Sequence, residues 1–269
     1  MAIKHMMGKM RYLDSLVKLK NVLTDEGHIV EVYELADIEM TAFNEWANHF
    51  RQNYCRDDII DSLISGTGMT KQEYLLSYKF PDAKDGFGPG TRSGDFAELL
   101  IADYLEFTLG YFIHRERYKN KFNKDTSAQG TDVIGFKVMG SKPSPNDEFI
   151  SFEVKAQSSV KDAKNRLQDA INDSYKDAIR KGETLSALKQ LYLEKGEYEK
   201  AFQVERFQNK PDRPYVDKYG AAAVHDTISY SEEIIKSVKT GTENRWMIVI
   251  KRNNLMELVH KLYEVASQC

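Results

Sequence analysis

The sequence lacks the features that mark several special classes of protein. It has two cysteines, Cys55 and Cys269, too few for a disulfide framework or a four-cysteine zinc site. No apolar run approaches the roughly 18 residues that a membrane span needs. Basic residues are spread through the first twenty positions without the long apolar stretch of a secretory signal. We therefore expect a protein of the reducing cytoplasm that does not associate with a membrane.

An excess of one charge is also lacking. The 269 residues include 38 Lys and Arg against 41 Asp and Glu, for a net charge of −3. A chain with this balance has no overall attraction for nucleic acid, so a DNA-binding face must be a local patch. Hydrophobic residues make up 41% of the chain, which excludes a disordered or collagen-like protein. The length suits one large domain, or a domain with a smaller appendage.

A stretch rich in glycine, proline and aspartate, PDAKDGFGPGTRSG at 81–94, divides the chain. Before it, aromatic and apolar residues recur at helical spacing from Phe43 to Tyr54, and Thr70 with Glu73 forms a predicted capping box. We expect a mainly helical N-terminal subdomain at 1–85, with one strand at 29–33.

From residue 94 onward the pattern alternates between helices and strands. A helix at 96–109 is apolar nearly all round, and a charged amphipathic helix is expected at 160–181. A helical insertion at about 182–243, with a loop at 210–220, precedes a final helix at 255–266. The expected strands are 111–117, 131–138, 148–157 and 246–250. This order predicts an α/β fold.

The strand at 148–157 has one apolar face and one chemically active face. Alternation puts five side chains on the second face: Phe149, Ser151, Glu153, Lys155 and Gln157. A hairpin that pairs Phe136 with Phe149 would set Asp132 opposite Glu153, with Lys155 beside them. Two carboxylates at that spacing raise each other's pKa unless a cation lies between them.

Mg²⁺ or Mn²⁺ suits such a pair, because these ions take oxygen ligands from carboxylates, phosphate and water. The metal would polarise a phosphoryl oxygen and lower the pKa of a bound water. Lys155 would orient that water or neutralise charge on the phosphate. Neither a Ser-His nor a Cys-His pair is evident, so the pattern favours phosphodiester hydrolysis over acyl transfer.

Each of these acids also has an ordinary interpretation. Asp95 and Glu98 fit a capping box, although Glu98 also aligns with the apolar stripe of its helix and both roles are compatible. Asp132 could cap a turn after Gly130. Glu153 and Lys155 could form a solvated cross-strand face.

The segment 115–124, RERYKNKFNK, combines basic and aromatic residues. Such a combination could contact phosphates and stack on bases, with Tyr118 and Phe122 as the aromatic groups. The alternative is a solvated loop. The predicted nucleic-acid-binding residues are Arg115, Arg117, Lys119, Lys121 and Lys124.

This arrangement resembles the PD-(D/E)XK nuclease superfamily over about 94–181. The resemblance rests on Glu98 in a helix, Asp132 in GTD, and EVKAQ at 153–157. It implies a restriction-endonuclease-like core at 94–269, a mixed central sheet flanked by helices. It also implies that Asp132 and Glu153 bind the metal with Glu98 as an accessory ligand. Lys155 would then act on the water and Gln157 would help to place the substrate.

Within that superfamily, three stretches are similar to the nuclease-like subunit of Hachiman-type anti-phage defence systems: GPGTRSGDFAELLIADYLE, SAQGTDVIGF and LMELVHKLYEVA. The resemblance implies a DNA endonuclease that acts with, and is gated by, a helicase subunit. The alternative is a non-catalytic subunit that uses the same fold to bind nucleic acid or a partner.

Overall fold

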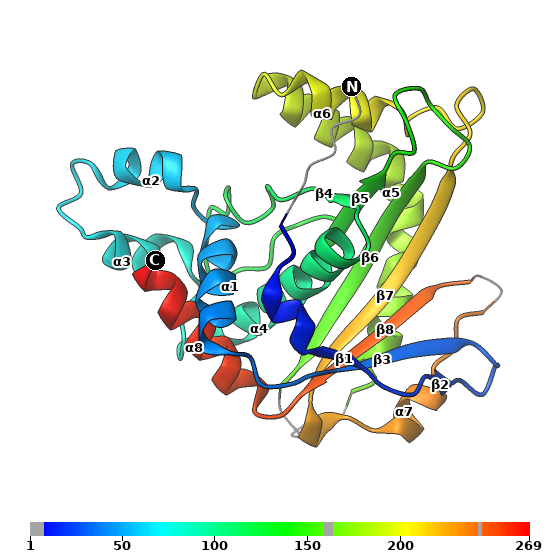
Figure 1. Ribbon diagram of the computed structural model, residues 1–269, viewed down its shortest axis with the longest axis horizontal. Helices are drawn as coiled ribbons and strands as arrows, with labels where there is room; N and C mark the ends of the chain where they lie inside the picture. Colours follow the sequence, from blue (N-terminus) through cyan, green and yellow to red (C-terminus); the bar gives the residue numbers. More distant parts are fainter. Residues whose placement is uncertain (1–7, 159–163, 242–243) are drawn as a thin grey trace.

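The computed structural model describes residues 8–158, 164–241 and 244–269. In this part of the chain one mixed sheet runs through the molecule in the order β1-β3-β8-β7-β6-β5-β4, with β2 paired to β3 (Figure 1). Strands β3, β8, β7 and β6 are parallel, and the outer strands pair antiparallel. The strands are β1 Leu16–Lys18, β2 Val22–Leu23, β3 Ile29–Leu35, β4 Phe112–Ile113, β5 Val133–Lys137, β6 Glu148–Gln157, β7 Val216–Asp226 and β8 Trp246–Arg252.

Helices cover both faces of this sheet (Figure 1). Helices α1, α4 and α8 share one hydrophobic cluster with the face that carries Ile150 and Phe152. Helix α5 packs on the opposite face through Leu167 and Ile171. The expected mixed α/β fold is therefore confirmed. The helices are α1 Met40–Gln52, α2 Asp57–Ile64, α3 Lys71–Tyr74, α4 Gly88–Asp103, α5 Arg166–Glu194, α6 Tyr198–Glu205, α7 Glu232–Lys236 and α8 Leu255–Gln268.

The hairpin of β5 and β6 has the register that the alternating pattern predicts. Phe136 pairs with Phe149, and Ile134 pairs with Ser151. Strand β6 begins and ends where the pattern places it. The register is well specified because both faces of this strand are buried, and a slip of one residue would exchange them.

The prediction of a helical insertion at 182–243 is wrong for its second half. Strand β7, eleven residues long, lies between β6 and β8 near the middle of the sheet, and its N-terminal part was expected to be a loop. Glycine and alanine are uncommon in strands, so Gly220 and the buried alanines at 221–223 gave no indication of one. Packing requires the glycine, since a Cβ on Gly220 would lie 2.3 Å from Cζ of Phe152.

The boundaries of two other elements also differ from expectation. Helix α4 begins at Gly88, inside the stretch 81–94 that was expected to divide the chain. A Cβ on Gly88 would lie 2.5 Å from the carbonyl oxygen of Asp82. The strand expected at 111–117 is confined to β4, and the chain then runs without strand structure to residue 132. Helix α5 is described from Arg166, and positions 160–163 of the predicted helix lie outside the described residues.

The N-terminal region contributes strands as well as helices. The strand expected at 29–33 is confirmed as β3, which pairs with β8, and the capping box of Thr70 and Glu73 is present at α3. Strands β1 and β2 were not expected. The division into folding units at 1–85 and 94–269 stays a prediction, although the two segments share one sheet and one hydrophobic cluster.

Candidate functional site

Asp132 and Glu153 lie at adjacent positions of the β5–β6 hairpin. Asp132 directly precedes β5, and the next residue, Val133, pairs with Phe152. Its Oδ2 accepts a hydrogen bond from the backbone N–H of Val154 at 2.9 Å. The structure therefore brings the two acids together as the sequence predicts.

Lys155 lies between the hairpin and α5. Its Nζ is 2.8 Å from Oε1 of Glu153 and 2.8 Å from Oδ2 of Asp173 on α5. Burial alone would lower the pKa of Lys155, but the hydrogen bonds to Asp173 and Glu153 outweigh it and raise the pKa above its usual value. Lys155 is therefore a fixed ammonium group at neutral pH.

Glu98 reaches the hairpin from α4 and is held by Arg117. Nε of Arg117 is 3.0 Å from Oε2 of Glu98, and Nη2 of Arg117 is 2.7 Å from Oδ1 of Asp132. The hydroxyl of Tyr118 also donates to Oε2 of Glu98. The guanidinium of Arg117 thus joins Glu98 to Asp132.

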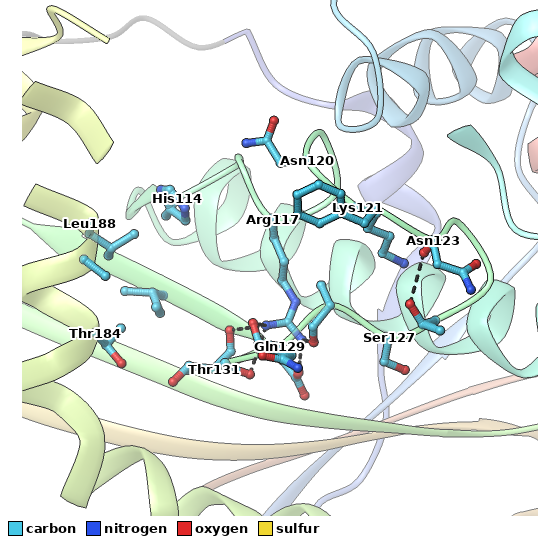
Figure 2. Close-up of a pocket in the computed structure, with 17 residues that line it drawn as sticks. His114, Arg117, Asn120, Lys121, Asn123, Ser127, Gln129, Thr131, Thr184 and Leu188 are labelled. Atoms are coloured by element: carbon cyan, nitrogen blue, oxygen red, sulfur yellow. Dashed lines mark hydrogen bonds and ion pairs between the residues drawn. The ribbon is translucent and has the colours of Figure 1, made fainter. Parts of the chain in front are cut away.

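Arg117 also fixes the loop that leads into β5. Its Nη1 donates to the carbonyl oxygens of Gln129, Gly130 and Thr131 at 3.1, 2.9 and 2.8 Å, and its Nη2 donates to that of Ala128 at 2.7 Å. Figure 2 shows Arg117 extended toward Gln129 and Thr131. A planar guanidinium has five N–H donors. Arg117 has six acceptors around it, so one hydrogen of Nη1 is shared between two of the three carbonyl oxygens that Nη1 contacts.

The carboxylates of this site are short of positive charge. Burial raises the pKa of Asp132 well above its ordinary value, and Glu98 and Glu153 raise it further. Burial also raises the pKa of Glu98, against the opposing effect of Arg117. Both acids would therefore be stabilised in their ionised form by an additional cation.

Oxygen donors of this kind suit Mg²⁺ or Mn²⁺, and Asp132 with Glu153 fits an ion that keeps water and phosphate as its other ligands. The structure does not assemble the three predicted ligands. Within residues 8–158, 164–241 and 244–269, no three Asp, Glu, His or Cys side chains converge closely enough to hold a metal ion. Glu98 could join the set only if Arg117 moved away from it.

Gln157 shares a face of β6 with Glu153 but is not part of the acidic site. It ends the strand and is buried, opposite His225 of β7. At about 3.3 Å per residue, it is about 13 Å along the strand from Glu153. Its predicted role in placing the substrate stays a prediction.

The five basic residues of 115–124 are all engaged in ion pairs. Arg115 contacts Asp103 and Glu106, Lys119 contacts Glu116, Lys121 contacts Asp95, and Lys124 contacts Asp125. Together with Arg117, their side chains are between 5% and 19% exposed. Nucleic-acid binding by these residues stays a prediction, and it would have to compete with these pairs.

The capping-box interpretation of Asp95 and Glu98 is wrong, because α4 begins seven residues before Asp95. Asp95 instead accepts hydrogen bonds from Tyr54 at 2.8 Å and from Lys121 at 2.6 Å. Burial raises the pKa of Asp95 to about 7.

Two acids of α5 were missed. Asp173 holds Lys155, and Oδ1 of Asp177 accepts a hydrogen bond from Thr131 at 2.8 Å. Burial raises the pKa of Asp177. Their spacing of four residues places them on one face of the helix that follows the EVKAQ stretch, and this spacing was the available signal.

A family model described as HamA matches residues 10–266, nearly the whole chain. The chain belongs to the HamA family. The resemblance drawn from the sequence is thus confirmed at the level of this family. A search of curated proteins finds no match to the chain. In the described part of this HamA-family chain, no helix is long and apolar enough to cross a bilayer.

Proposed function

We propose that this HamA-family chain is a metal-dependent nuclease of the PD-(D/E)XK type that acts in Hachiman anti-phage defence. The observation that carries the proposal is the pairing of Asp132 with Glu153 across β5 and β6, with Lys155 beside them. Family membership supports the defence role.

When bound by Asp132 and Glu153, Mg²⁺ or Mn²⁺ would supply a Lewis acid for the scissile phosphate and a water of lowered pKa. The chain's own contribution is positional. Asp173 and Glu153 hold the Lys155 ammonium group at the edge of the site, where it orients the attacking water and offsets charge on the phosphate. The hydrogen bond from Val154 fixes the Asp132 carboxylate against the hairpin.

DNA is the proposed substrate, and a helicase subunit is the proposed partner and gate. The net charge of −3 and the ion pairs of the 115–124 segment support this arrangement. A segment whose basic residues are already paired, in a chain without net positive charge, binds the DNA backbone weakly. Delivery by a partner would compensate for that weakness and confine cutting to infected cells.

One observation favours the alternative of a non-catalytic binding subunit. Arg117 already supplies a cation to Glu98 and Asp132, so the acidic cluster is held together by the chain itself. In that case the acids stabilise the fold and no metal is needed. Metal binding separates the two functions.

The first test is cleavage of supercoiled plasmid with Mg²⁺ or Mn²⁺ and with EDTA. It is done with the chain alone and with the helicase subunit that we propose as its partner. Lys155→Ala is expected to abolish metal-dependent nicking. Lys218→Ala is the matched control, since Lys218 is also a strand lysine paired with a glutamate, 2.9 Å from Glu148. Nicking that persists in Lys155→Ala would remove the proposed role of Lys155.

The second test measures metal binding without catalysis. Ions that bind the folded state raise its melting temperature by mass action. Millimolar Mn²⁺ is expected to raise the melting temperature of the wild type and of Asp217→Asn, a strand acid held by two lysines elsewhere. Asp132→Asn is expected to remove the increase. A wild type that neither nicks DNA nor responds to metal would favour the binding subunit.

A further inference from the structure

A pocket of about 600 Å³ adjoins the acidic site. The 114–132 segment forms one wall, which includes Asp132. Arg117 of this wall faces the other wall, formed by Thr184 and Leu188 of α5 (Figure 2). This volume lies within the range of about 300–1,000 Å³ found for small-molecule sites. Because Asp132 is part of the lining, a group bound at that end of the pocket would contact it.

Phe122 lines the pocket with a fully exposed ring. The residues around it are fixed. Lys121 is bound to Asp95. The carboxylate of Asp125 accepts a hydrogen bond from the backbone N–H of Asp82, and its carbonyl oxygen accepts one from the Thr91 hydroxyl. The loop therefore holds an aromatic ring in solvent, although the neighbouring side chains are tied to the protein. Such a ring is positioned to stack on a flat partner.

The polar groups of the pocket are mostly neutral. Asn120, Asn123 and Gln129 supply amides, and Ser127 supplies a hydroxyl (Figure 2). The basic residues in the lining, Arg117 and Lys121, are already paired with carboxylates. Neutral donors and acceptors beside an aromatic ring match the edge and the face of a nucleobase better than they match a free anion.

We infer that this pocket binds one unpaired nucleotide of the DNA strand, with its base stacked on Phe122 and its sugar-phosphate directed toward Asp132. The inference rests on the proposed nuclease function, and it makes a single strand the substrate class. A base inside a duplex has both faces covered by its neighbours, so it cannot stack on Phe122 without leaving the helix.

The test is fluorescence anisotropy with a labelled 12-nucleotide DNA strand in EDTA, where no metal-dependent cutting occurs. Phe122→Ala is expected to weaken binding about fivefold or more, as loss of one base–aromatic stack does. Phe122→Trp is expected to keep the affinity. Phe202→Ala is the matched control, because Phe202 is an exposed phenylalanine of α6 that does not line the pocket.

Photocrosslinking of a strand that carries 5-iododeoxyuridine adds a direct measure, with the adduct expected on the 114–132 segment. No measurable binding by the wild type, equal affinity of Phe122→Ala, or equal competition by duplex DNA would overturn the inference. Tighter binding of the same sequence as RNA would overturn the assignment to DNA.

These outcomes are independent of the nuclease test. Plasmid nicking together with unchanged binding by Phe122→Ala would remove the pocket and leave the nuclease. Loss of binding in Phe122→Ala without any metal-dependent nicking would keep the pocket and remove the nuclease.

Discussion

Helix α4 carries two buried acidic clusters with opposite electrostatics. At its C-terminal end, Asp103 accepts a hydrogen bond from Tyr12 at 2.6 Å and lies 3.0 Å from His49 and 2.7 Å from Arg115. Burial would raise the pKa of Asp103, but His49 and Arg115 outweigh it and lower the pKa to about 2. The Asp103 carboxylate is therefore ionised, and hydrogen bonds and ion pairs hold both of its oxygens.

In the middle of the helix, Glu98 shares the single guanidinium of Arg117 with Asp132, and both acids have raised pKa values. Burial is similar in the two clusters, so the number of bases beside each acid makes the difference. Asp103 has two bases beside it, whereas Glu98 and Asp132 share one. The first cluster stabilises the fold, because Asp103 has both His49 and Arg115 beside it, although it shares Arg115 with Glu106. In the second cluster an additional cation would stabilise the ionised form of both acids, which agrees with the metal site that we propose.

The largest expected effect comes from removing the shared base. Arg117→Ala leaves Glu98 and Asp132 buried without their cation, which costs about 3–5 kcal/mol in the free energy of unfolding. Urea denaturation measures this loss. If Mn²⁺ binds these acids as we propose, it takes the place of the guanidinium, and millimolar Mn²⁺ is expected to restore more stability to Arg117→Ala than it adds to the wild type.

Arg115→Ala is the matched control, since it removes the corresponding arginine from the Asp103 cluster. We expect this variant to lose stability and to recover less of it in Mn²⁺, because His49 stays beside Asp103. Equal recovery in both variants would mean that the ion acts on the whole protein, and the distinction between the clusters would fail.

The second prediction uses pH. Burial raises the pKa of Asp95, next to Glu98 on α4, from 3.8 to about 7. Between these values the folded state holds a proton that the unfolded state has released, so the free energy of unfolding falls as the pH rises from about 4 to about 7, by a few kcal/mol. Asp95→Asn is expected to make this slope shallower.

Urea denaturation at several pH values measures the slope, and Asp212→Asn, in an exposed loop, is the control that should match the wild type. For Asp103 the sign is opposite. Its folded pKa is lowered, so its contribution is lost only as the pH falls from about 4 through about 2. If the free energy of unfolding of Asp95→Asn fell with pH as steeply as that of the wild type between about pH 4 and 7, the dependence could not be assigned to Asp95.

The hairpin of β5 and β6 could be predicted from the sequence because the pattern that specifies it lies within the two strands themselves. Alternation along β6 identifies both faces, and pairing Phe136 with Phe149 then places Asp132 beside Glu153. Strand β7 could not be predicted in the same way. Gly220 and its neighbouring alanines are small because Phe152 and helices on both faces approach them, and such packing is not visible in the segment itself.

The partners of charged residues were equally hidden. The segment 115–124 indicates a basic surface, yet Arg117 and Lys121 reach back to Glu98 and Asp95, which precede them by 19 and 26 residues. Sequence shows which residues are charged but not which are buried together. Phe122, expected to stack on bases, is the aromatic residue of this segment that is exposed, whereas Tyr118 is buried.

The smallest expected change in the free energy of unfolding has opposite signs in two matched variants, Asp103→Asn and Asp132→Asn. Asp103→Asn removes an ionised acid whose pKa is lowered from 3.8 to about 2, which corresponds to a loss of about 2 kcal/mol in the free energy of unfolding at neutral pH. Asp132→Asn removes an acid whose ionisation is disfavoured by burial, Glu98 and Glu153, so it is expected to raise the free energy of unfolding. Urea denaturation of both variants at pH 8 without metal makes the comparison. Destabilisation of similar size in both variants would show that Arg117 neutralises its two acids as fully as His49 and Arg115 neutralise Asp103. The pair of Glu98 and Asp132 would then need no metal ion.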